Sequence, residues 1–158
     1  MFLRTYLLKQ EIKQNSYFIW KNESKNIQPI KSFKPLNLDL IIGVERQKNI
    51  LLNNTRSFAE GNFTNNALLW GARGNGKSSL IKSVFHEVLS TFKTLKLIQL
   101  NKDNIFDIDL IYQLISKLSD YRFIIFIDDL SFEKIDSDYK IFNQYAPDEF
   151  KKESNNGY

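Results

Sequence analysis

Residues 71–78 read GARGNGKS, which fits the phosphate-binding pattern G-x-x-x-x-G-K-[ST] at every fixed position. Glycines let the backbone curl so that successive N–H groups point at the phosphate oxygens of a nucleotide. In this pattern the Lys77 ammonium reaches the β- and γ-phosphates, and the Ser78 hydroxyl ligates Mg²⁺. The pattern therefore predicts a nucleotide site with Mg²⁺, formed by Gly71, Ala72, Arg73, Gly74, Asn75, Gly76, Lys77, Ser78 and Ser79.

A second set of chemical groups follows the apolar run FIIFI at residues 123–127. A strand that is apolar on both sides belongs in the middle of a parallel sheet covered by helices. Ligands of open α/β sheets bind at the carboxyl ends of the strands, which is where Asp128 and Asp129 stand. In P-loop nucleotidases the first acid holds the Mg²⁺ shell and the next polarises the attacking water. We assign these roles to Asp128 and Asp129.

The elements that must position these groups alternate along the chain. The run NALLW at 66–70 predicts a strand before the glycine-rich loop, and LKLIQL at 95–100 predicts another. Apolar residues at helical spacing predict one helix after the loop and one between the last two strands. The first stripe is Leu80, Ile81, Val84, Phe85, Val88, Leu89 and Phe92, and the second is Ile108, Ile111, Leu114, Ile115 and Leu118. This order predicts an α/β fold with a parallel sheet flanked by helices, in which a helix N-terminus faces the phosphates.

Composition limits the class of protein. A chain of 158 residues, 42% hydrophobic and 14% aromatic, has the size of one domain with one core. It has no cysteine, which excludes disulfides and cysteine-based metal sites. No stretch approaches the roughly 18 apolar residues of a membrane helix, and the start lacks the apolar run of a signal peptide. We therefore expect a cytoplasmic protein without a membrane partner.

The net charge of +4 is unevenly distributed. Residues 1–35 carry seven Lys or Arg against two acidic residues, and aromatic side chains are interleaved among them. Such a segment can be a nucleic-acid surface, or a solvated arm whose aromatics dock on the core. We favour the second interpretation, because charge asymmetry alone is weak evidence for nucleic acid. The segments expected are a basic N-terminal segment (1–35), a nucleotide-binding core (36–140) and a polar tail (141–158).

A third element precedes the phosphate loop: LDLIIGVERQK at 38–48 leads into a helical stretch. It resembles the segment of AAA+ ATPases in which an apolar residue and a glycine cradle adenine, here Gly43 and Val44. The resemblance continues through NNALLWGARGNGKSSL at 65–80 and FIDDLSFE at 126–133. Over roughly residues 17–140 the chain resembles an uncharacterised bacterial AAA+ family known only as a domain of unknown function. The resemblance implies a P-loop NTPase that binds ATP with Mg²⁺ and forms a homo-oligomer when full-length.

Two departures from the AAA+ pattern bear on catalysis. Asp129 stands where most AAA+ ATPases have glutamate, and its shorter side chain reaches the attacking water less directly; Glu133 is a candidate substitute. AAA+ domains also continue with a sensor strand, an arginine finger and a helical lid, for which residues 141–158 offer no candidate. We therefore expect the sequence to be truncated or frameshifted near residue 141, and to hydrolyse ATP negligibly. Two alternatives stay open: a P-loop kinase, and an interaction module that responds to a nucleotide without turnover.

Overall fold

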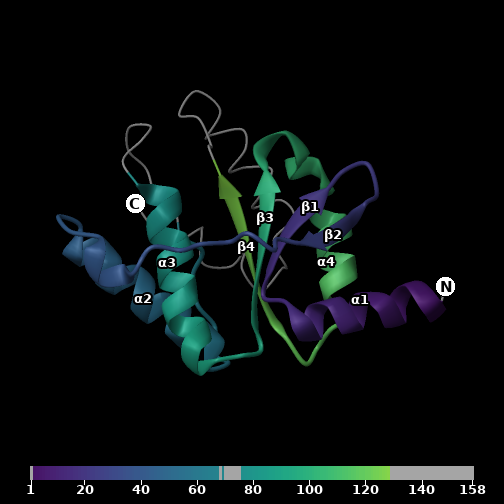
Figure 1. Ribbon diagram of the computed structural model, residues 1–158, viewed down its shortest axis with the longest axis horizontal. Helices are drawn as coiled ribbons and strands as arrows, with labels where there is room; N and C mark the ends of the chain where they lie inside the picture. The colour runs from purple at the N-terminus through teal and green to yellow at the C-terminus, as the bar shows by residue number, and fades with distance from the viewer. Residues whose placement is uncertain (1, 68, 70–75, 129–158) are drawn as a thin grey trace, which may run out of the picture.

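The structure is a computed structural model that describes residues 2–67, 69 and 76–128 (Figure 1). Its helices are α1 (Phe2–Gln14), α2 (Glu45–Ala59), α3 (Lys77–Thr91) and α4 (Ile108–Ile115), with short 3₁₀ helices η1 (Leu38–Leu40) and η2 (Lys102–Asp107). Its strands are β1 (Tyr17–Lys21), β2 (Asn26–Pro29), β3 (Leu95–Asn101) and β4 (Arg122–Asp128). No helix in these described ranges is long and apolar enough to cross a membrane.

The four strands form one sheet in the order β2-β1-β3-β4. β3 pairs in parallel with both β1 and β4, whereas β1 and β2 form an antiparallel hairpin. In the β3–β4 register Asn101 lies opposite Asp128, so both strands end at the same edge of the sheet. The prediction of an α/β fold with a sheet flanked by helices is confirmed, but the sheet is mostly rather than wholly parallel, because β1 and β2 pair antiparallel.

Helices cover both faces of the sheet because side chains alternate along each strand. On β3, Leu95 and Leu97 belong to a cluster with α2 and α3, and Ile98 and Leu100 belong to a cluster with α1 and α4. Leu95, Ile98 and Leu100 are fully buried. The sheet is therefore the middle layer of three, with α2 and α3 on one side and α1 and α4 on the other (Figure 1).

Two expectations about the strands need correction. The run 123–127 does form a strand, but β4 lies at the edge of the described sheet, and only Phe126 in it is buried. β3, with neighbours on both sides, takes the central position instead. Of the strand predicted at 66–70, Asn66, Ala67 and Leu69 form no strand, and Leu68 and Trp70 lie outside the described residues. A strand needs a hydrogen-bonded neighbour, and within the described residues no strand pairs with the outer edge of β4.

The N-terminal hairpin is an addition that the sequence patterns did not predict. Tyr17–Ile19 of β1 pair with Leu97–Gln99 of β3, and the side chains of Phe18 and Trp20 are buried. This part of the basic N-terminal segment is therefore built into the sheet. Phe18 and Trp20 supply core on the α1 and α4 face, whereas Tyr17 packs on the α2 and α3 face.

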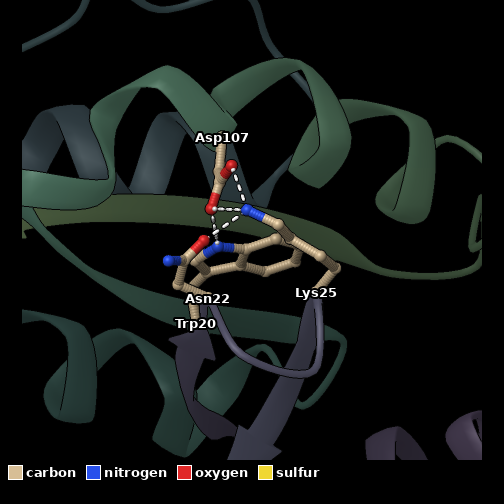
Figure 2. A network of polar contacts seen from close by, with 4 residues as sticks. All are labelled: Trp20, Asn22, Lys25 and Asp107. Carbon is tan, nitrogen blue, oxygen red and sulfur yellow. Dashed lines mark hydrogen bonds and ion pairs between the residues drawn. The ribbon is translucent and has the colours of Figure 1, made fainter.

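Asp107 fixes the hairpin to the start of α4. Its carboxylate accepts a hydrogen bond from the Trp20 indole N–H at 2.8 Å and forms an ion pair with the Lys25 ammonium at 2.8 Å (Figure 2). The same ammonium donates to the side-chain oxygen of Asn22. Burial raises the pKa of Asp107, but the bonds from Lys25 and Trp20 outweigh it and hold the pKa below its ordinary value. Lys25 reaches this position with a left-handed backbone, φ 46°.

Candidate functional site

A short hydrogen bond joins the two predicted motifs. Ser78 lies in the first turn of α3, and Asp128 is the last residue of β4. The Ser78 hydroxyl donates to Oδ1 of Asp128 at 2.6 Å, across 50 positions of sequence, and both side chains are partly buried. The fold thus brings together the hydroxyl and the carboxylate to which the sequence assigned the Mg²⁺ shell.

The start of α3 has the properties of an anion site. Gly76 is its N-cap, with φ 73° and ψ 13°, a left-handed conformation that side chains with a Cβ rarely adopt. No side chain caps this end, and its first turn holds no acidic residue. The leading N–H groups of a helix have no partner inside the helix and carry a partial positive charge. Together these features fit a bound phosphate.

The segment predicted to hold adenine packs against the same helix. Gly43 has φ 81°, and Val44 is the N-cap of α2. Val44 packs on an apolar cluster of α2, α3 and the segment before α2. The buried members of this cluster are Leu38, Leu51, Leu80 and Val84. Val44 therefore lies near the first turns of α3, on the helix whose start carries Ser78.

Lys48 holds this segment in place, and the sequence patterns did not single it out. Its side chain is 11% exposed, and its ammonium donates to the carbonyl of Ile41 at 2.9 Å. It also pairs with Glu45 at 2.9 Å and lies 3.5 Å from the carbonyl of Leu38. A buried ammonium needs such partners, so these contacts fix the loop before α2. The available signal was the i, i+3 spacing of Glu45 and Lys48.

The remaining predicted residues divide into two groups. Lys77 and Ser79 lie beside Ser78 in the first turn of α3, and all three are partly buried, whereas Gly43 and Gly76 are exposed. The others lie outside the described residues: Gly71, Ala72, Arg73, Gly74, Asn75 and Asp129. Candidate base Glu133 and the tail 141–158 lie outside them as well.

The donor set agrees with the chemistry of Mg²⁺. Within the described ranges no group of three or more His, Cys, Asp or Glu side chains could hold a metal ion. Mg²⁺ in nucleotide sites is bound through one or two protein oxygens together with phosphate and water. A hydroxyl beside a carboxylate, at a helix start that suits phosphate, is a donor set of this kind.

Comparison with known proteins identifies the family. No curated protein and no solved structure matches the chain significantly. The model of a family described as "Protein of unknown function (DUF815)" matches residues 13–156, a range that begins in α1 and includes both motifs. The chain belongs to the DUF815 family.

Proposed function

We propose that the protein binds ATP with Mg²⁺ as a P-loop ATPase of the bacterial AAA+ type. The observation that carries the proposal is the 2.6 Å bond between Ser78 and Asp128. In an octahedral Mg²⁺ shell with ligands at about 2.1 Å, adjacent ligand oxygens lie about 3.0 Å apart. The hydroxyl of Ser78 and the carboxylate of Asp128 are therefore close enough that together they would hold one Mg²⁺ ion after a small separation.

The described residues around this pair provide for the rest of the nucleotide. The start of α3 offers its leading N–H groups to the β- and γ-phosphates, and Lys77 adds a cation there. Val44, which packs on the apolar cluster that α3 shares, and the exposed Gly43 before it are the proposed contacts to adenine. This placement of an adenine segment ahead of α2 favours the AAA+ type over a P-loop kinase. Mg²⁺ screens the phosphate charge, and Asp129 is the proposed base for the attacking water.

Thermal unfolding with and without Mg·ATP tests the binding, because a ligand bound only by the native state raises the melting temperature. We expect a rise in the wild-type protein and no rise in Lys77→Ala. The matched control is Lys93→Ala, which removes an exposed ammonium just beyond the opposite end of α3 and keeps the rise. An unchanged rise in Lys77→Ala would place the nucleotide elsewhere.

Two further arms separate the metal from the nucleotide. Titration of ATP with and without Mg²⁺ should show tighter binding in its presence, and Ser78→Ala should remove most of that difference. Steady-state release of phosphate then measures turnover, which we expect to be negligible; substantial release that is lost in Asp128→Ala would show an active ATPase. Binding that is tight but equal with and without Mg²⁺ would contradict the role given to Ser78 and Asp128.

A further inference from the structure

α1 has a second apolar face that the rest of the described chain leaves open. Leu8 and Ile12 of this helix are buried in the core, at 8% and 0% exposure. Leu3, Tyr6 and Leu7 are 71%, 60% and 54% exposed, and their i, i+3, i+4 spacing places them on one stripe. Figure 1 shows α1 reaching outward beyond the hairpin, with its N-terminal end at the margin of the molecule.

A cavity of about 330 Å³ runs along this stripe between α1 and the hairpin. At about 30 Å³ for each water molecule, it has room for an aliphatic side chain from outside. Its lining residues are Leu3, Arg4, Leu7, Leu8, Glu11 and Asn26. The open face of α1 is therefore hollowed as well as apolar.

The charges at the two ends of this cavity are opposite. Arg4 and Glu11 are both exposed and lie seven residues apart, two turns along the same side of the helix. They are about 10 Å apart along the axis, too far to pair with each other. The Arg4 guanidinium donates to the carbonyl of Ser24 at 3.2 Å, and no ion pair within the described ranges involves Glu11.

We propose that this face binds α1 of a second copy of the chain, antiparallel about a two-fold axis at Leu7. Arg4 lies about 4.5 Å before Leu7 along the helix axis and Glu11 about 6 Å after it. In an antiparallel pair, Arg4 of each copy therefore comes level with Glu11 of the other to within about 1.5 Å. The long side chain of arginine spans that difference. A two-fold interface makes each contact twice, so two ion pairs flank a central leucine contact.

The size of the helix limits the strength of this association. A helix of 13 residues is about 20 Å long. One helix pair of this length buries less than the roughly 1,200 Å² at which stable interfaces begin. We therefore expect a reversible dimer whose population rises with protein concentration in the micromolar range.

Sedimentation velocity of the whole chain over a range of concentrations tests the pairing. Arg4→Glu and Glu11→Arg should each weaken the dimer at least tenfold, because each places like charges opposite one another. The double variant restores both pairs and should dimerise within about threefold of the wild type. A one-to-one mixture of the two single variants should also dimerise, since opposite charges then meet at both ends. Lys9→Glu, an exposed charge change on the opposite side of α1, is the control and should dimerise like the wild type.

The absence of cysteine from the chain allows an independent test. Leu7→Cys should form a disulfide-linked dimer under mild oxidation, because the two-fold axis brings the two copies of this position together. Lys9→Cys, also in the middle of α1 but on the side of the helix opposite Leu7, should stay monomeric. Both outcomes together support the pairing. A wild-type chain that stays monomeric at every concentration, or a dimer indifferent to the charge reversals, would overturn it.

Discussion

The two helices that start near the carboxyl edge of the sheet differ in what stands at their N-termini. α4 follows Asp107 and carries Asp109 in its first turn. α3 follows Gly76, opens with Lys77, and has no acidic residue in its first turn. A helix N-terminus carries about half a positive charge, which nearby carboxylates stabilise. At α4 the N-cap and the first turn supply those carboxylates, whereas at α3 the carboxylate comes from another element, Asp128 of β4, which is bonded to Ser78. A helix start that carries such a pair suits a phosphate bound together with Mg²⁺.

The two aspartates near these helices differ in the same way. Asp107 is bound by the Trp20 indole and the Lys25 ammonium, and neither of these donors can ligate a metal. Asp128 accepts a hydrogen bond from the hydroxyl of Ser78, a group that can share a metal ion. The same residue type, aspartate, thus attaches the hairpin at position 107 and forms part of a candidate Mg²⁺ site at position 128. The hydroxyl beside Asp128, a group that can ligate a metal, distinguishes it from Asp107.

The largest effect should come from closing the start of α3 to an anion. Gly76→Val places a β-branched residue at φ 73°, where such residues are genuine outliers. The strain displaces the N–H groups that approach the phosphate. We expect at least a hundredfold loss of affinity for Mg·ATP, equivalent to about 2.7 kcal/mol, by isothermal titration calorimetry.

Gly61→Val is the matched control, because Gly61 also has a left-handed backbone, φ 103°, but lies beyond the far end of α2. It should lower the free energy of unfolding about as much as Gly76→Val and leave the affinity for nucleotide unchanged. Equal losses of affinity in both variants would mean that general destabilisation, and not the geometry at α3, governs binding.

The sequence predicted the local elements better than their arrangement. The apolar stripes after residue 79 and after residue 107 correctly indicated α3 and α4, because amphipathic helices show their buried face in their periodicity. The hairpin was missed, since β1 and β2 are short and the pairing of β1 with β3 is a long-range contact. The order of the strands could not be predicted from local patterns either, and β4 was therefore expected in the middle of the sheet.

In the candidate site, too, the residues could be predicted from the sequence but their spatial arrangement could not. The phosphate-loop pattern assigned roles to Lys77 and Ser78 from the sequence alone. The position of Asp128 at the end of an apolar run did the same for that residue. The approach of Ser78 and Asp128 to 2.6 Å depends on how α3 and β4 pack, which no local pattern contains. Lys48 was missed because its partners are mainly backbone carbonyls, and carbonyls carry no sequence signature.

A smaller effect should follow from neutralising the carboxylate at α4. Asp107→Asn weakens the bonds from Lys25 and Trp20, and we expect the free energy of unfolding to fall by about 1–2 kcal/mol at neutral pH. The pKa of Asp107 lies below its ordinary value of 3.8 in the folded protein. Its contribution is therefore complete above the unfolded pKa, and disappears as the pH falls from about 4 through the folded pKa. Urea unfolding at a series of pH values measures this.

The difference between the wild type and Asp107→Asn should accordingly shrink below about pH 4. Asp103→Asn, an exposed aspartate in the same 3₁₀ helix, is the control and should change the free energy of unfolding by less than about 0.5 kcal/mol. If Asp107→Asn lowered the free energy of unfolding by the same amount down to the lowest pH, the carboxylate charge would contribute nothing to the attachment of the hairpin.

The smallest effect concerns the backbone that carries Lys25 to Asp107. Lys25→Ala and Lys25→Gly both remove the ion pair, so they differ only in the backbone at φ 46°. A left-handed conformation costs a residue with a Cβ about 1–2 kcal/mol, part of which glycine loses again through its greater freedom in the unfolded chain. Lys25→Gly should therefore be more stable than Lys25→Ala by about 0.5–1 kcal/mol in urea unfolding. Glu23 is the control, because it lies in the same turn but has no positive φ. There the alanine variant should be more stable than the glycine variant. If alanine were also the more stable residue at position 25, backbone strain at Lys25 would be excluded.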